Sequence, residues 1–160
     1  MHTYCDAYKS YVLPILEYAS SVWNPHELCL IKKLESVQHY FTRRLFIRCN
    51  IPYVNYTNRI KLLSLQSLEC RSLYIDLRVL YDIVKGHLVC KFANSLDFAC
   101  NTNSRGHDMK IRQQYYRTNY GKYSFVNRIV PLWNKLPAVV VHTNVSKSFS
   151  LRLLDLHLCV

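Results

Sequence analysis

Apolar residues recur every three or four positions along most of the chain, a spacing that places them on one face of a helix. The first such pattern covers residues 4–23 and consists of Tyr8, Val12, Ile15, Ala19 and Val22. Pro14 lies within it, and a proline inside a helix removes a backbone donor and clashes with the preceding turn. We therefore expect a helix that is kinked or interrupted at Pro14.

The clearest amphipathic pattern covers residues 26–46. Its apolar face consists of Leu30, Leu34, Val37, Phe41 and Leu45. Its other side is polar and mostly cationic, with Lys32, Ser36, His39 and Arg43 flanked by Lys33 and Arg44. This arrangement predicts a helix that carries a basic stripe along its length.

A short helix over residues 57–63 and a longer one over residues 67–85 are expected next. Ser67 is placed as an imperfect N-cap of the longer helix, and Gly86 is placed to end it. Apolar residues occupy two sides of this helix: Leu73, Leu77, Leu80 and Val84 on one, and Leu68, Ile75, Val79 and Ile83 on the other. An apolar arc of this width is typical of the central helix of a bundle.

The periodicity is lost from residue 92 to residue 121. Residues 101–106 are predicted as an exposed loop, and residues 108–116 as a short strand or hairpin arm. Helical spacing returns before Pro137, with Phe125, Ile129, Trp133 and Leu136 on one side. A final helix is expected after Asn144, with inward-facing Val145, Phe149, Leu153 and Leu156.

The predicted fold class is therefore mainly α. We expect a helical bundle of about five or six helices, with a basic irregular or short β segment between residues 92 and 122. We divide the chain into a helical part (1–91), the basic segment (92–122) and C-terminal helices (123–160) that pack on the first part. With 160 residues, half of them apolar, the chain can bury a core without metal or disulfide staples.

The chain is strongly basic, with 21 Lys and Arg against 10 acids and a net charge of +11. From Phe98 to Leu154 the only acid is Asp108, and the cations are Arg105, Lys110, Arg112, Arg117, Lys122, Arg128, Lys135, Lys147 and Arg152. That segment therefore holds 9 − 1 = +8 of the total. Such a field favours a polyanionic partner, either nucleic acid or an anionic membrane surface. Simple solubility is the alternative reading.

Several classes of protein are disfavoured by the sequence. No run of about 18 apolar residues occurs, as a membrane helix would need, and the N-terminal residues lack the pattern of a signal peptide. The seven cysteines are an odd number and include no C-x-x-C pair. We therefore expect most of these thiols to be small core residues and the compartment to be reducing and intracellular, nucleus or cytoplasm. Cys90, Cys100 and His107 are the nearest approach to a metal site, and we predict no metal and no cofactor.

Catalytic signatures are also lacking. The sequence has no Asp-Asp, D-x-D or E-x-x-H pattern for metal or paired-carboxylate chemistry. It has no G-x-S-x-G elbow and, with three glycines, no glycine-rich phosphate loop. A Ser/His/Asp or Cys/His site built by the fold stays open. We predict no catalytic residues and no enzymatic activity for this chain alone.

Five blocks in fixed order carry a family resemblance. They are YKSYVLPILEYASSVWNP (8–25), LESVQHYFTRRLF (34–46), RIKLLSLQSLECRSLYIDLRVLYDIVKG (59–86), RGHDMKI (105–111) and FVNRIVPLWNKLP (125–137). Together they resemble the carboxy-terminal part of the reverse transcriptase of non-LTR retrotransposons, the jockey and chicken-repeat type of LINE element. The resemblance extends from Tyr8 to about Leu154.

The resemblance implies a position after the polymerase palm, at the end of the thumb and in the helical tail beyond it. It implies contact with an RNA template and a DNA primer, and with the palm and fingers of a longer polymerase. The palm's paired aspartates, the fingers and an endonuclease would lie upstream of Met1, so it implies no polymerase activity for this chain. Leu13, His39, Tyr40, Ser64 and Gln66 depart from the family pattern, which suits either a decaying copy or natural variation.

Two groups of cations are candidate phosphate contacts. One lies on the basic helix: Lys32, Lys33, Arg43, Arg44 and Arg48. The other lies among Tyr115, Tyr116, Tyr120 and Tyr123, a mixture suited to single strands, and consists of Arg105, Lys110, Arg112, Arg117 and Lys122. For both groups, a solvated surface is the alternative.

The block at residues 125–137 is predicted to be mainly structural. Trp133 is expected in the core, and Asn127, Arg128 and Asn134 are expected to tie neighbouring segments to this helix. Arg128 is also a candidate phosphate contact. The predicted structural residues are Pro14, Trp23, Trp133, Asn134 and Pro137.

These observations predict a domain that binds RNA or DNA through its phosphates without base specificity and with no membrane partner. Two alternatives remain. One is a non-catalytic helical domain that binds another protein, and the other is a non-functional remnant of a dead element.

Overall fold

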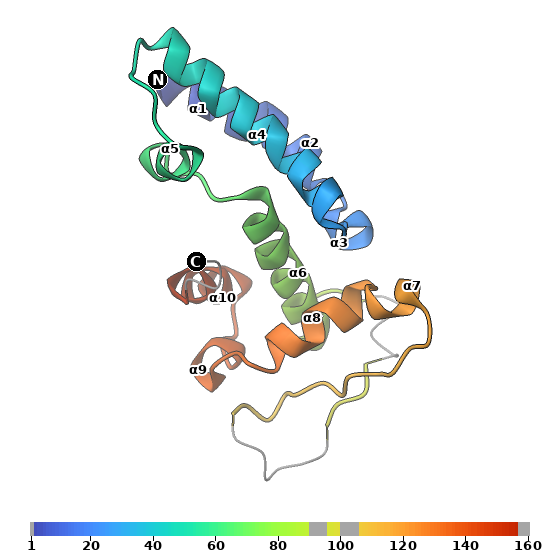
Figure 1. Ribbon diagram of the computed structural model, residues 1–160. Coiled ribbons are helices and arrows are strands. Elements are labelled where there is room, and N and C mark those ends of the chain that lie inside the picture. The colour runs from blue at the N-terminus through green and yellow to red at the C-terminus, as the bar shows by residue number, and fades with distance from the viewer. Residues whose placement is uncertain (1, 90–95, 100–105, 157–160) are drawn as a thin grey trace. The chain divides into compact units, whose positions relative to one another are not determined.

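The computed structural model describes residues 2–89, 96–99 and 106–156 (Figure 1). The chain is mainly helical, as the fold prediction states. It divides into two compact units, Met1–Ser72 and Leu73–Val160. The division falls inside one helix, α6 (Leu68–Val84), and so lies within the predicted first part rather than at its end. Among the described residues, no helix is both long and apolar enough to cross a membrane.

The N-terminal helical pattern is interrupted twice. It forms α1 (His2–Ala7), a π-helical turn η1 (Tyr8–Val12), α2 (Leu13–Glu17) and α3 (Ser20–Trp23). Pro14 lies in the first turn of α2, where its missing N–H costs little. The irregular turn before Pro14 therefore confirms the predicted interruption.

The second interruption, at Ala19, was not predicted. Ala19 has a φ of 51°, a left-handed conformation that alanine rarely adopts. Trp23 spans this turn, because its indole N–H donates to the carbonyl of Tyr18 at 2.5 Å. Trp23 therefore bridges the turn at Ala19, although it is 41% exposed.

The long basic helix is α4 (Leu28–Arg48), which leads to α5 (Tyr56–Leu62). Its predicted apolar face is wrong in part, since Leu30 and Val37 are each 41% exposed. The buried residues of α4 are Gln38, Thr42, Leu45 and Phe46. The buried Gln38 side chain is satisfied by a network of hydrogen bonds. It accepts a bond from the Tyr8 hydroxyl and donates to the Tyr56 hydroxyl and to the carbonyl of Gln66.

Helix α6 has the predicted boundaries. The Ser67 hydroxyl accepts from the backbone N–H of Cys70 at 3.3 Å, and Gly86 follows the helix with a φ of +73°, which glycine adopts without strain. Cys70 is buried and disulfide-bonded, whereas Cys5, Cys29 and Cys49 are free thiols. The disulfide differs from the expectation that the thiols stay reduced.

The second unit is built on the later turns of α6 together with α7 (Asn119–Lys122), α8 (Phe125–Trp133), α9 (Ala138–Val141) and α10 (Ser146–Asp155). Its core includes Leu77 and Tyr81 of α6, Trp133 of α8 and Phe149 of α10. Trp133 and Phe149 are fully buried, which confirms Trp133 as a core residue. Val145 is 54% exposed, so its predicted inward position is wrong.

The predicted strand at residues 108–116 is reduced to an isolated bridge between Phe98 and Ile111. The N–H of Ala99 donates to the carbonyl of Lys110 at 2.8 Å, and that of Arg112 to Asp97 at 2.7 Å. Of the predicted exposed loop at 101–106, only Gly106 falls within the described residues, and it is exposed.

Candidate nucleic-acid interface

The outward face of α4 gathers five of the predicted phosphate contacts. Lys32, Lys33, Arg43, Arg44 and Arg48 are all exposed. With a rise of 1.5 Å per residue, they cover about 24 Å of one helix. We call this surface the basic face of α4.

Within the part of the chain that the structure describes, no acidic side chain pairs with these cations. Glu35 is the only acid of α4, and its carboxylate accepts hydrogen bonds from the Tyr56 hydroxyl and from the backbone N–H of Leu68. The second of these bonds is 2.9 Å long. None of the five cations forms an ion pair with another described residue. The five cations of the basic face are therefore not neutralised by a described acid.

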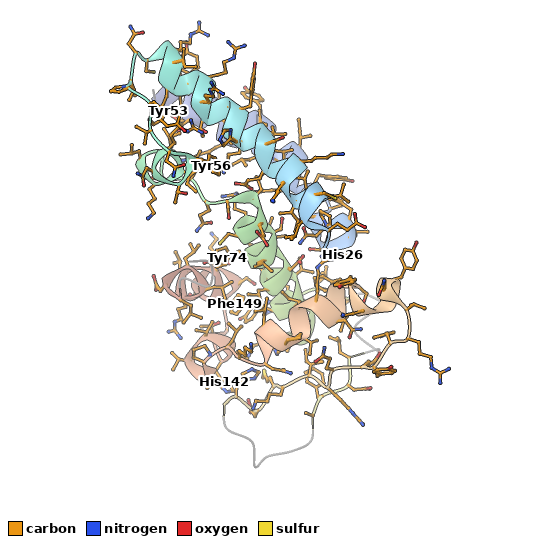
Figure 2. The ribbon with its side chains drawn as sticks, viewed as in Figure 1. His26, Tyr53, Tyr56, Tyr74, His142 and Phe149 are labelled. Atoms are coloured by element: carbon orange, nitrogen blue, oxygen red, sulfur yellow. The ribbon has the colours of Figure 1, made fainter. Side chains whose placement is uncertain are left out.

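The polar network beneath the basic face fixes the orientation of α4. Tyr56, labelled in Figure 2, connects α5 to both Glu35 and Gln38 of α4. Burial, followed by the charge of Glu35, raises the pKa of Tyr8 to about 12. Burial and the hydrogen bond to Glu35 raise the pKa of Tyr56 as well. Both phenols therefore stay protonated near neutral pH and act as donors in the network.

Tyr40 adds an exposed aromatic ring to the basic face. It is 59% exposed, and the Nε of Arg44 donates to its hydroxyl at 2.9 Å. The guanidinium carbon of Arg44 lies 5.3 Å from the ring centroid, within cation–π range. Arg48 lies at the same distance from the ring of Tyr4. In the sequence, Tyr40 stands out only as a departure from a family pattern, although its spacing of four residues from Arg44 is that of a contacting pair on a helix.

The second group of cations belongs to the other unit. Arg112, Arg117 and Lys122 are exposed, Lys110 is half-buried, and Arg105 lies outside the described residues. Tyr115 and Tyr120 are 89% and 94% exposed, and the ammonium of Lys122 lies 5.3 Å from the Tyr123 ring centroid. The structure therefore leaves aromatic rings and cations together on this segment, as the sequence predicts.

Arg128 has a structural role. Its Nε and Nη2 each lie 3.0 Å from Oδ2 of Asp76, whose side chain is fully buried. The Arg128 side chain is itself only 16% exposed. Because its charge is needed to compensate a buried carboxylate, we remove Arg128 from the candidate interface.

The end of α8 holds residues 107–111 in place. The Asn134 side chain accepts from the N–H of Ile111 at 2.9 Å and donates to its carbonyl at 2.8 Å. The Trp133 indole donates to the carbonyl of Met109 at 2.8 Å, and a ring nitrogen of His107 lies 3.0 Å from the carbonyl of Trp133. Through these contacts Trp133 and Asn134 hold residues 107–111 beside α8.

Two further residues of this motif have local roles. The Asn127 side chain donates to the carbonyl of Gly121 at 2.8 Å, so it joins α8 to the end of α7. Pro137 is the N-cap residue of α9 and separates that helix from α8. The motif from 125 to 137 is therefore a connector between segments of the second unit.

Asp82, His87 and Ser146 form a cluster that resembles a catalytic triad in composition only. The Ser146 hydroxyl donates directly to Asp82 at 2.5 Å. Nδ1 of His87 lies 3.4 Å from that hydroxyl and 3.5 Å from Asp82, so the same ring nitrogen faces both groups. A relay needs one imidazole nitrogen for the nucleophile and the other for the acid. This cluster instead ties the start of α10 to α6.

Across the part of the chain that the structure describes, no three His, Cys, Asp or Glu side chains gather as metal ligands would. His107 is described, but its predicted companions Cys90 and Cys100 lie outside the described residues.

Comparison with known proteins adds one similarity. The chain is 32% identical over 83 residues to uncharacterized protein B0403.1 of Caenorhabditis elegans, an alignment that covers 52% of this chain and 42% of that protein. The chain therefore matches less than half the length of this relative. No protein-family model matches the chain, and no solved structure matches it.

Proposed function

We propose that this chain binds nucleic acid through phosphate contacts on the basic face of α4, as the thumb-and-tail part of an RNA-directed DNA polymerase of a LINE-type mobile element. The observation that carries the proposal is the set of five exposed cations on one helix whose single acid is engaged elsewhere. The chain contributes binding and not the polymerase active site.

The chemistry needs only cations on a rigid support. Each phosphate that a Lys or Arg neutralises releases condensed counterions, and this gain in entropy drives binding without regard to sequence. The helix that carries the cations is held in place on its inner side, where Gln38 accepts a hydrogen bond from Tyr8 and Glu35 accepts one from the backbone N–H of Leu68. A fixed row of cations loses less conformational freedom on binding than cations on a mobile loop.

The family resemblance supplies the identity of the partners. If the five sequence blocks reflect descent from a LINE reverse transcriptase, the bound strands are an RNA template and a DNA primer. The palm and fingers of a longer polymerase then supply the catalytic carboxylates. The exposed cations of the second unit, Arg112, Arg117 and Lys122, are further candidate phosphate contacts.

A salt titration tests the proposal. Fluorescence anisotropy of a labelled single-stranded oligonucleotide should show binding that weakens steeply and linearly on a plot of log affinity against log salt. Absence of binding at low salt, or binding independent of salt, would overturn the proposal.

One observation favours a second candidate, a helical domain that binds another protein. Tyr11, Ile15, Tyr18 and Val22 are 74–84% exposed and lie in η1, in α2, in the turn before α3 and in α3. We call this set the apolar ridge. Exposed apolar surface of this kind is common at protein interfaces. Binding through the apolar ridge should survive moderate salt and be lost when its apolar residues are changed, the opposite of phosphate binding.

A further inference from the structure

The basic face of α4 contains a shallow hollow open to solvent. Its lining is formed by Ser36, Val37, His39, Tyr40 and Arg43. The small Ser36 side chain bends back to the helix, because its hydroxyl donates to the carbonyl of Lys33 at 2.6 Å. Because Ser36 is short and bends back, it leaves space between the longer side chains of His39, Tyr40 and Arg43.

Tyr40 lines this hollow and also contacts Arg44. Arg44 lies over the Tyr40 ring and bonds its hydroxyl, yet it does not line the hollow. Arg44 thus orders the ring without filling the hollow. His39 also lines the hollow, and its ring packs against Tyr56 with the ring centroids 4.9 Å apart.

The hollow combines an ordered aromatic wall with a cation. Arg43 also lines it and forms no ion pair with a described residue. A flat, uncharged ring joined to a phosphate is complementary to this pair, because the ring can stack on Tyr40 while Arg43 neutralises the phosphate. A nucleotide has both parts.

We propose that this hollow takes an unstacked base of a single-stranded nucleic acid, with Tyr40 as the stacking surface and Arg43 on the adjacent phosphate. This inference rests on the proposed function and specifies the form of its ligand. In a duplex, the bases are stacked on each other and paired, so their faces cannot reach a side chain on a convex helix. The hollow therefore selects single strands over duplexes.

The test compares two oligonucleotides of equal length and equal phosphate number. One is oligothymidylate, and the other carries abasic spacers in place of the bases. Both are titrated against the full chain and against the variants Tyr40→Leu, Tyr40→Phe and Tyr53→Leu. Tyr53, labelled in Figure 2, is a matched control because it is 88% exposed in the same unit and does not line the hollow.

The wild-type chain should bind oligothymidylate about 5-fold or more tightly than the abasic strand, as expected for base–aromatic stacking. Tyr40→Leu should bind the two strands equally, whereas Tyr40→Phe and Tyr53→Leu should keep most of the preference. Equal binding of both strands by the wild-type chain, or a preference that survives in Tyr40→Leu, would overturn the inference and leave phosphate binding intact. Failure of both strands to bind would overturn the proposed function itself.

Discussion

At the scale of single residues, the Arg128–Asp76 pair is the feature most sensitive to change. Replacing Arg128 with alanine leaves the fully buried Asp76 without its counter-charge. We expect the free energy of unfolding to fall by about 3–5 kcal/mol, the range for breaking a buried pair by removing one partner. Urea denaturation followed by circular dichroism measures the change.

The exposed Arg112 provides the control for this variant. Arg112→Ala removes the same charge from the same unit and should change stability by less than about 0.5 kcal/mol. If Arg128→Ala proves as stable as Arg112→Ala, then Arg128 does not compensate Asp76 and returns to the list of candidate phosphate contacts.

Tyr8 gives a prediction for alkaline pH. Its pKa is raised from an ordinary value near 10 to about 12, so the unfolded chain loses this proton at lower pH than the folded chain. The stability linked to Tyr8 is therefore fully present below pH 10 and is lost as pH rises towards 12. Tyr8→Phe should show a smaller loss of stability over this window than the wild-type chain.

Denaturant titrations between pH 9 and pH 12 check this expectation, where the window follows from the ordinary and raised pKa values of Tyr8. Tyr53→Phe is the control, because Tyr53 is 88% exposed. A pH dependence that is the same in Tyr8→Phe and in the wild-type chain would show that the Tyr8 hydroxyl is not protected by the fold.

At the scale of elements, α4 shows what the spacing of apolar residues can and cannot predict about a helix. The pattern predicts the helix nearly to its ends, because it needs only local spacing. It fails on which side faces inward, since Gln38 is buried while Leu30 and Val37 are partly exposed. The partners that make Gln38 acceptable in the interior are Tyr8 and Tyr56, which lie 30 and 18 positions away. Such distant contacts leave no trace in the local pattern.

A single substitution at Asn134 can remove the hydrogen bonds that connect the end of α8 to Ile111. Asn134→Ala removes both hydrogen bonds to the backbone of Ile111. We expect faster hydrogen exchange at the Ile111 amide and a stability loss of about 1–3 kcal/mol, because two polar backbone groups lose their partners. Protection at Phe149 in α10 should change less. Unchanged hydrogen exchange at Ile111 would show that the Asn134 side chain does not hold the backbone of Ile111.

The apolar ridge should contribute little to the stability of the isolated chain. Ile15 and Val22 are 74% and 84% exposed. The double variant Ile15→Ser/Val22→Ser should therefore unfold within about 0.5 kcal/mol of the wild-type chain. A loss of several kcal/mol would mean that the ridge is buried in solution. Normal stability combined with improved solubility would support its role as a surface for a protein partner.

At the scale of the whole molecule, the sequence predicts the helical class and the basic character but not the division into units. The predicted boundaries followed the loss of periodicity near residue 92. The structure divides the chain between Ser72 and Leu73, inside α6. The reason is that Leu77, Leu80 and Tyr81 pack with α8 and α10 in a core of their own. A continuous helical pattern cannot show that its two ends belong to different cores.

The same limit applies to the candidate interface. Net charge and helical spacing predict which cations lie on the outward face of α4, because exposure of lysine and arginine is the general rule. They do not distinguish Arg128, whose partner Asp76 lies 52 positions earlier in the chain. Net charge and helical spacing also do not show that the Glu35 carboxylate is engaged away from the basic face. Its partners are the Tyr56 hydroxyl and the backbone N–H of Leu68 at the start of α6.

The most direct test of the central claim is the salt dependence of single-strand binding in two charge-matched variants. Arg43→Gln/Arg44→Gln removes two cations from the basic face, and Lys9→Gln/Lys61→Gln removes two exposed cations of the same unit that lie on η1 and α5. We expect the slope of log affinity against log salt to fall by about 1.4 in the first variant, roughly 0.7 for each phosphate contact, and hardly to change in the second. Equal slopes in the two variants and the wild-type chain would mean that the basic face does not bind the strand.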